Sequence, residues 1–581
     1  MGSLPSKKHK KHGNPLSKLI LILIPVVIII IIIGAAFLTK YLPSNEKADL
    51  YAYFGLTESG DASGSSDGIA VVIDSQILPA QALLANNTLY LDYDTVHDYL
   101  NDRFYRDNNE NLTIYAGADS VTKVYDGESA YYEGTALNEE GYIIVKYLDK
   151  TAYVALDFVE KYTNMDYSMY EDPFRVVISA ATGEQICVNA RDGAKIRVKG
   201  GIKSPILETC EADQKLVVLE RLENWTKVLA EDGIIGYVKN DKLSDEYTDT
   251  ITHSFTEPVY SHITRDHKIN MVWDLITAEA ANADISTTLS NNTAINAICP
   301  TWFSLSSSDG DITSLADRDY VNSARSAGVE VWGLVGNLEV EDSVTISVLS
   351  HTSTREHLES AILASAIEYG LDGVNIDFEI SDATVGDSYI EFIRELAILC
   401  GNNNLLLSVD VPIALSNNDF YSYDELSKVC DYVIIMAYDE HYEGSGAGSV
   451  SSIPWVKSGI EYTLNAGVDA DRFLLAVPFY TRVWFIDTEG NGTSTSSEVI
   501  SISAQSDILS SHDATATYDE DTGQNYAEYT SDGTLRQVWL EDATSMGARM
   551  QLVSSYGLGG VAGWRSGLET QEIRDVISSN L

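Results

Sequence analysis

The sequence predicts a multidomain protein whose C-terminal half is an α/β barrel. First, 581 residues are too many for one ordinary hydrophobic core. Second, eight apolar, strand-like runs alternate with helical segments from about residue 253 onward. Third, short alternating runs typical of small β-rich domains come before them, behind one long apolar segment. We therefore expect a (β/α)8 TIM barrel with an insertion before its last strand, preceded by an α+β domain, a small β-barrel and one transmembrane helix.

The apolar segment covers residues 19–38, LILILIPVVIIIIIIGAAFL, which is about the length needed to cross a bilayer. A basic tail, residues 1–18, precedes it, and acidic residues follow from Glu46. This asymmetry predicts a cytoplasmic tail, an anchor in the lipid bilayer of the cell membrane and an extracellular body. A signal peptide cleaved near Gly34 is the alternative.

Residues 41–68 read as a polar linker, and residues 69–182 as an α+β domain. Strands dominate this domain, with two helices expected at TVHDYLNDRF and ALDFVEKYT. Part of it resembles the copper-amine-oxidase N-terminal-like domain of bacterial cell-surface proteins. No catalytic constellation is visible in it.

Residues 184–245 predict five short strands, including a hairpin in which WTKVLA and IIGYV flank a tight turn. The stretch resembles bacterial SH3-like barrels, and the residues that carry the resemblance are Trp225, Lys227, Gly236, Tyr237 and Val238. Members of that family often bind cell-wall peptides, which implies a bacterial cell surface. A role as a spacer is the alternative.

Composition excludes some functions. The chain has 86 Asp and Glu against 38 Lys and Arg, a net charge of −48, so it lacks the basic balance that nucleic-acid binding requires. Of five cysteines, Cys187 and Cys210 could pair, whereas the others read as buried small side chains. Neither a CxxC nor an HExxH spacing occurs, so we predict no metal site and no cofactor.

Residues 253–581 carry the barrel pattern. Helical segments such as REHLESAILASAIEYG separate the strand-like runs INMVWD, INAICPTWF, VEVWGLVG, GVNIDFE, LLLSVDVP, DYVIIMAYD, FLLAVPFY and GVAGWRSG. Between the last two runs, residues 481–555 include Gly, Ser, Thr and Tyr-rich material. We expect this stretch to form an inserted subdomain beside a cleft.

Acidic side chains stand inside one of these apolar runs. Side chains alternate along a strand, so Asn375, Asp377 and Glu379 share one face of GVNIDFE. In a barrel that face points inward, and its last residues reach the C-terminal rim, where active sites lie. In DYVIIMAYDE, Met436 and Tyr438 share a face in the same way. For the acids, a buried ion pair or a helix-cap acid is the alternative, and for Tyr438 it is a core tyrosine.

Residues 372–379, DGVNIDFE, resemble the DGxDxDxE signature of glycoside hydrolase family 18, with Asp372 and Gly373 as its structural start. The resemblance extends over about residues 255–575. It is supported, in order, by MVWD, PTWF, MAYD, PFYTRVW, VWLED and GVAGW. This family contains chitinases, endo-β-N-acetylglucosaminidases and spore-cortex or cell-wall N-acetylglucosaminidases, and the bacterial cell-wall and spore branch is the most similar.

The resemblance implies substrate-assisted, retaining catalysis. Glu379 would protonate the glycosidic oxygen, Asp377 would orient the 2-acetamido group, and Tyr438 would donate a hydrogen bond to its oxygen. Trp564 would form an apolar floor under the sugar ring. Met436, Asp439 and Asn375 would line the same subsite, and Trp302 and Arg482 would lie at the cleft edge.

Two positions depart from the family pattern: Asn375 stands where the family has an acid, and Thr481 stands where chitinases commonly have Gly. The sequence predicts an enzyme that cleaves β-1,4 bonds in N-acetylglucosamine-containing polysaccharides. Peptidoglycan is the first candidate, and chitin and N-glycans follow. A non-catalytic, chitinase-like carbohydrate-binding protein is the alternative, and a scaffold whose N-terminal domains do the work is a third possibility.

Overall fold

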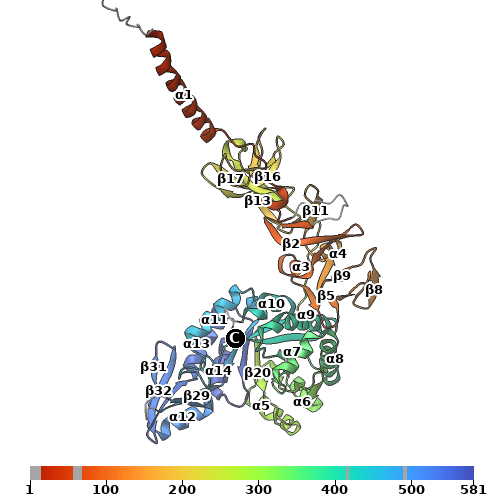
Figure 1. Cartoon of the computed structure of the whole chain (residues 1–581). Helices are drawn as coiled ribbons and strands as arrows, with labels where there is room; N and C mark the ends of the chain where they lie inside the picture. Colours follow the sequence, from red (N-terminus) through yellow and green to blue (C-terminus); the bar gives the residue numbers. More distant parts are fainter. Residues whose placement is uncertain (1–14, 57–67, 414–417, 488–493) are drawn as a thin grey trace, which may run out of the picture. The chain divides into compact units, whose positions relative to one another are not determined.

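The computed structural model describes residues 15–56, 68–413, 418–487 and 494–581 (Figure 1). The side chains of residues 15–22 and 35–39 are outside this description. The chain divides into two compact units: residues 1–100 with 148–256, and residues 101–147 with 257–581.

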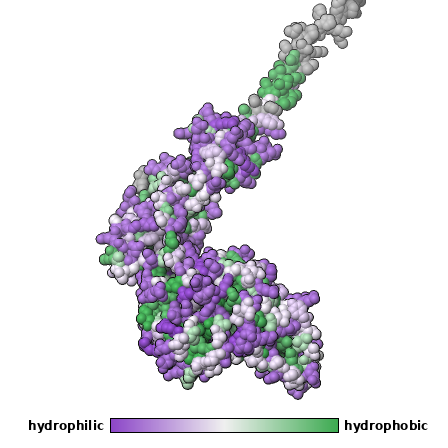
Figure 2. Space-filling view, turned by 180° about the vertical axis from the view of Figure 1, so that it is seen from behind, coloured by the Kyte–Doolittle hydropathy of each residue, from purple (hydrophilic) through white to green (hydrophobic). Residues whose placement is uncertain are grey.

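Helix α1 (Pro15–Tyr41) contains the predicted anchor, and most of the predicted basic tail lies outside the described residues. Its described side chains from Leu23 to Ile33 are apolar and well exposed, which Figure 2 shows as a green stretch. In the part of the chain that the structure describes, no helix meets the combined length and apolarity needed to cross a membrane.

The α+β domain of the first unit is built on a mixed sheet. Its helices α3 (Tyr93–Tyr99) and α4 (Leu156–Tyr162) begin where the sequence predicts helices. Six of the sheet's strands occur in the order β11 (Asp166–Tyr170), β12 (Arg175–Ser179), β1 (Ile69–Ile73), β2 (Gln76–Ala85), β3 (Thr88–Asp92) and β10 (Thr151–Ala155). Strand β1 is fully buried and pairs in parallel with β12.

A second sheet covers the region predicted as a small β-barrel. It contains, in order, β15 (Ile206–Thr209), β14 (Lys195–Arg197), β18 (Ile235–Lys239), β17 (Trp225–Ala230), β16 (Lys215–Arg221), β13 (Gly183–Asn189) and β19 (Tyr247–Ile251). The predicted hairpin is present as β17 paired with β18. Two strands more than expected occur: β15, which pairs with β14, and β19, which pairs with β13.

Two expectations for this region differ from the structure. Cys187 and Cys210 are both buried and free, so they form no disulfide. The predicted linker 41–68 is also not wholly a free connection. Ala48 donates a backbone hydrogen bond to Ile206, and Phe54 and Leu56 are buried in the core of the second sheet, because apolar side chains there have a surface to pack against.

The eight predicted barrel strands are present, all parallel. They close in the order β21 (Ala297–Pro300), β20 (Ile269–Asp274), β34 (Gly560–Trp564), β28 (Phe473–Pro478), β27 (Tyr432–Met436), β26 (Leu406–Pro412), β25 (Gly373–Asp377) and β24 (Glu330–Gly336). The pairing of β21 with β24 closes the ring. A short hairpin, β22 (Phe303–Leu305) with β23 (Ile312–Ser314), extends beyond it.

Alternation along the barrel strands produces two cores. Inward side chains such as Met271, Trp332 and Ile434 fill the barrel, and outward ones such as Val374, Ile376 and Phe378 pack against the helices. The helices are α5 (Ile285–Asn291), α6 (Arg318–Ser326), α7 (Asp342–Ser350), α8 (Thr352–Tyr369), α9 (Gly386–Asn402), α10 (Tyr423–Val429), α11 (Ile453–Asn465), α13 (Ala543–Ser555) and α14 (Gln571–Asn580).

The insertion between β28 and β34 forms a separate antiparallel sheet. Its order is β30 (Ser494–Ser501), β29 (Tyr480–Asp487), β33 (Thr534–Leu540), β32 (Gln524–Ser531) and β31 (Thr517–Asp519), with α12 (Ile502–Ser511) beside it. The sequence predicts an insertion over residues 481–555, which includes α13. This helix packs against α11 and α14, as a barrel helix does. The insertion thus ends near residue 540.

Residues 101–147 pack on the barrel helices, although the sequence places them within the α+β domain 69–182. This segment forms the sheet β4 (Phe104–Asp107), β5 (Leu112–Ala116), β6 (Val121–Tyr125), β7 (Ala130–Glu133) and β8 (Ala136–Glu139). Arg103 pairs with Glu425 of α10, and the Asp107 carboxylate accepts hydrogen bonds from the backbone and side chain of Thr352 at the start of α8. These buried contacts make the segment part of the barrel unit.

Candidate active site

Strand β25 places Asn375 in the barrel interior, where it is 0% exposed. Its Oδ1 accepts hydrogen bonds from Trp273 Nε1 at 3.2 Å and from Cys299 Sγ at 3.3 Å. Its Nδ2 donates to Ser408 Oγ at 3.0 Å and to Asp410 Oδ1 at 2.8 Å. All of the amide's hydrogen-bonding groups are therefore engaged with the barrel wall below the mouth.

Asp377 ends the same strand, two residues closer to the rim. Its Oδ1 is buried and has no hydrogen-bond partner among the described residues. Burial, with a smaller contribution from the negative charge of Glu379, raises the pKa of Asp377 to about 7. Such a carboxyl group can change its protonation state near neutral pH.

Glu379 lies just beyond the strand, on the exposed rim, and Asn337 fixes its backbone. The Glu379 N–H donates to Asn337 Oδ1 at 2.9 Å, and Asn337 Nδ2 donates back to the Glu379 carbonyl at 3.1 Å. Partial burial and the nearby Asp439 raise the pKa of Glu379. Sequence reasoning missed Asn337, although a polar residue directly after strand β24 was a usable signal.

Tyr438 follows β27 and packs against the inner core, as does Trp564 at the end of β34. The Trp564 ring meets the Trp273 ring edge-on at 5.8 Å between centroids. Burial and nearby acids raise the pKa of Tyr438 far above its ordinary value, so its hydroxyl stays protonated and can donate. Tyr480 donates to Asp439 Oδ1 at 2.6 Å, which holds that carboxylate beside Tyr438.

The remaining predicted residues have different surroundings. Met436 is half-buried at the end of β27. Asp372 accepts a hydrogen bond from the Val331 backbone at 3.0 Å, and a Cβ on Gly373 would lie 3.0 Å from the Trp332 ring, so both are structural. Arg482 lies on β29 of the insertion and donates to Ser497 Oγ at 2.9 Å.

Trp302 is not at the cleft edge. It is 1% exposed, its Nε1 donates to Asn282 Oδ1 at 2.8 Å, and its ring contacts Tyr320 at 5.0 Å between centroids. Because β21 ends at Pro300, the strand alternation that underlies the expectation no longer applies at residue 302. The indole packs instead in the core between the strands and helices.

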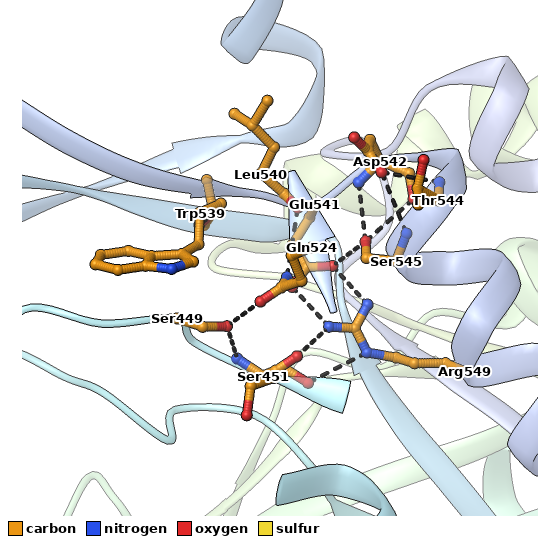
Figure 3. A network of polar contacts seen from close by, with 12 residues as sticks. Ser449, Ser451, Gln524, Trp539, Leu540, Glu541, Asp542, Thr544, Ser545 and Arg549 are labelled. Atoms are coloured by element: carbon orange, nitrogen blue, oxygen red, sulfur yellow. Dashed lines mark hydrogen bonds and ion pairs between the residues drawn. The ribbon is translucent and has the colours of Figure 1, made fainter. Parts of the chain in front are cut away.

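A buried ion pair, also missed by sequence reasoning, supports the backbone next to Tyr438. Figure 3 shows this pair, Arg549 with Glu541, and its contact with Ser451. Arg549 of α13 binds both oxygens of Glu541, with Nη2–Oε1 at 2.7 Å, and both side chains are 0% exposed. Its Nε also donates to Ser451 Oγ at 3.2 Å. Ser451 Oγ in turn donates to the Ala437 carbonyl at 2.7 Å, one residue before Tyr438.

The arrangement suits acid–base chemistry on a polar ligand. Asp377 and Glu379 have raised pKa values at the mouth of the barrel, beside a protonated phenol and a tryptophan ring. In the described ranges, no group of three or more His, Cys, Asp or Glu side chains is placed to hold a metal ion.

Comparisons with known proteins agree with this geometry. Residues 296–569 match the family described as "Glycosyl hydrolases family 18". The "Putative sporulation-specific glycosylase YdhD" of Bacillus subtilis is 30% identical over 223 residues, which is 38% of this chain and 52% of that protein. The "Cortical fragment-lytic enzyme" of the same organism is 25% identical over 245 residues, 40% of this chain and 56% of that protein. The chain thus spans about half the length of these curated relatives.

A solved structure agrees in fold. The crystal structure of the "C-terminal domain of putative chitinase" from Desulfitobacterium hafniense DCB-2 matches with a TM-score of 0.50 at 23% identity. The match covers 54% of this chain and 100% of that one. The region that matches glycosyl hydrolase family 18, residues 296–569, thus contains most of the closed eight-stranded barrel and its acidic mouth.

Proposed function

We propose that this domain hydrolyses β-1,4 glycosidic bonds next to N-acetylglucosamine by substrate-assisted, retaining catalysis. The observation that carries the proposal is a cluster of acids at the mouth of the barrel. Asp377 ends strand β25, Glu379 follows two residues later and its charge acts on Asp377, and Asp377 in turn acts on Tyr438. The raised pKa of Glu379 favours its role as a proton donor, and Asp377, with a pKa of about 7, can become anionic when the substrate requires it.

Each side chain has a distinct task. Glu379 protonates the leaving oxygen and then accepts a proton from the incoming water. Asp377 accepts the acetamido N–H and stabilises the positive charge that develops when the acetamido oxygen attacks the anomeric carbon. Tyr438 donates to that acetamido oxygen, and Trp564 contacts the apolar face of the sugar ring.

Peptidoglycan is the first candidate substrate, and chitin is the second. The names of two relatives of the barrel refer to sporulation and to the lysis of cortical fragments. A carbohydrate-binding protein without activity is the competing function. Glu379, the group that such a protein would be expected to lack, is present here with its backbone fixed on both sides by Asn337.

The test compares wild type with Glu379→Gln on purified peptidoglycan, chitooligosaccharides and an N-glycoprotein. We expect the variant to lose at least about 100-fold in product release while it retains binding. The matched control is Glu461→Gln, which changes an exposed glutamate on α11. Equal product release by wild type and Glu379→Gln would overturn catalysis and favour the binding function. The polymer that wild type cleaves fastest identifies the substrate.

Residues 19–38 are also proposed to anchor the protein in the cell membrane, with the body outside. The exposed apolar side chains of α1 support this, because water would otherwise contact them. In cell fractionation, the full chain should stay with membranes after a high-salt wash, and Ile29→Asp/Ile31→Asp should release it. Recovery of the wild-type chain in the supernatant would contradict the anchor.

A further inference from the structure

One buried acid of the barrel has no part in the scheme above. Asp410, on strand β26, is 2% exposed. Strands β25 and β26 pair in parallel with Asn375 opposite Ser408 and Ile376 opposite Val409. The next pair in this register is Asp377 and Asp410. Neighbouring strands lie about 4.8 Å apart, so these two side chains are adjacent on the inward face.

The hydrogen bonds around Asn375 orient its amide toward Asp410. Trp273 Nε1 and Cys299 Sγ both donate to Asn375 Oδ1, which leaves Nδ2 to face β26. From there it donates to Asp410 Oδ1 at 2.8 Å. Residue 375 is thus a fixed donor to Asp410 and has no ionisable proton of its own.

No described cation faces the two acids. Several described titratable groups interact electrostatically with the pair. They are Glu379 beyond β25, Cys299 on β21, Tyr438 after β27, Tyr389 on α9 and Tyr421 beside α10. All of these are neutral or negative. Two carboxylates this close, without a cation, cannot both be charged at low cost.

We propose that Asp410 is the proton partner of Asp377, so that the two adjacent carboxyl groups hold one proton between them. When Asp377 must be anionic to accept the acetamido N–H, its O–H bond breaks and an O–H bond forms on Asp410. The pair keeps a total charge of −1 throughout, and no other bond changes. Its use in the reaction rests on the proposed hydrolysis, but the pairing itself does not.

The pKa directions agree with a shared proton. Burial, followed by the charge of Asp377, raises the pKa of Asp410 well above its ordinary value. The pKa of Asp377 is raised to about 7. Two acids that interact this strongly titrate as a pair, and near neutral pH the pair holds one proton.

A double-mutant cycle tests the pairing without any activity measurement. We compare the thermal unfolding of the full chain as wild type, Asp377→Asn, Asp410→Asn and the double variant between pH 5 and pH 8. Either single variant should gain Tm relative to wild type as pH rises, because it removes the like-charge repulsion. The double variant should gain no more than either single variant. Additive effects at every pH would overturn the proposal.

Activity provides the second test, because Asp410 acts through Asp377 as a positioning residue. Asp410→Asn should lower kcat about 10-fold or more and shift the limb of the pH profile that Asp377 sets. Asn375→Asp/Asp410→Asn returns one inner acid to the group and should restore kcat. Ser408→Ala, which removes the other acceptor of Asn375 Nδ2, is the control and should leave the profile unchanged.

The outcomes separate this inference from the proposed function. If wild type is inactive but the double-mutant cycle shows coupling that depends on pH, the proton pair is supported and the proposed hydrolysis is rejected. If wild type is active, the effects on Tm are additive and Asp410→Asn leaves the pH profile of kcat unshifted, the proposed hydrolysis is supported and the proton pair is rejected. If Asp410→Asn does not fold, Asp410→Ser, which also removes the second carboxyl group, takes its place in the cycle.

Discussion

Buried carboxylates occur in two regions of the barrel unit, and their surroundings differ. Beneath the helices and the insertion, Glu395 binds Arg355 at 2.7 Å, and Glu541 is held by Arg549 on both oxygens. At the mouth, Asp410 is buried and Asp377 is half-buried, and no described cation pairs with either of them. Since burial is common to both regions, the presence of a guanidinium partner separates acids that hold the fold from acids available for proton transfer.

The largest effect should come from breaking a paired acid. Arg549→Met leaves Glu541 buried without its cation, which typically costs about 3–5 kcal/mol in the free energy of unfolding. Thermal or denaturant unfolding measures the loss. The matched control is Arg549→Met/Glu541→Leu, which removes both charges and should recover most of it. A single variant no less stable than the double variant would show that Glu541 does not depend on Arg549.

The next largest effect should come from an acid at the mouth of the barrel, whose removal should lower activity and not stability. Asp377→Asn should lower kcat about 100-fold or more, because the acetamido N–H and the developing positive charge lose an anionic acceptor. Its stability should not fall. The raised folded-state pKa means that the wild-type carboxyl destabilises the fold increasingly as pH rises from about 4 toward 7. The variant should therefore be the more stable protein at pH 8, as measured by Tm, and a loss of Tm there would contradict this.

A pH scan of a paired acid sharpens the contrast. Burial alone would raise the pKa of Glu395, but Arg355 and further hydrogen bonds bring it below its ordinary value. A depressed pKa contributes stability above the unfolded-state pKa, and this contribution is lost as pH falls through the folded-state pKa. Glu395→Gln should cost on the order of 1–3 kcal/mol at pH 7 and less below pH 4. A cost that stays constant down to pH 3 would contradict the sign.

The smallest effect should follow Ser451→Ala, where the two regions meet. Loss of its hydrogen bond to the Ala437 carbonyl should cost about 1 kcal/mol of stability. It should also lower kcat a few-fold, because the backbone that carries Tyr438 is less firmly placed. Ser458→Ala, on an exposed part of α11, is the control. An unchanged kcat would restrict the Figure 3 network to a purely structural role.

Alternation within single strands made most of the barrel predictable. It located the eight strands and the inward face of GVNIDFE, since a period of two needs no knowledge of distant contacts. The same signal was available in LLLSVDVP, where Ser408 and Asp410 alternate with apolar residues, although it was not used for the site. The expectation for Trp302 was wrong because its strand ends before that residue.

Contacts between distant segments were not readable from the sequence. The support of Tyr438 by Arg549 joins residues about a hundred positions apart, and neither of the local motifs PFYTRVW and MAYD encodes it. The same holds for residues 101–147, whose strand pattern looks like the domain around it. These residues belong to the barrel unit because Arg103 contacts α10 and Asp107 contacts α8. The local periodicity of a sequence does not indicate such distant partners.

That placement sets where the barrel can be cut from the chain. The polypeptide passes between the two units at residues 100–101, 147–148 and 256–257, so neither unit is one continuous stretch. A recombinant fragment that begins near residue 253 would lose Arg103 from Glu425 and Asp107 from Thr352, and would expose the helix surface that β4 and β5 cover. An expression boundary at residue 101 retains these partners but leaves β10 and β12 without β1, β2 and β3, so a fragment with an intact barrel should keep the first unit as well.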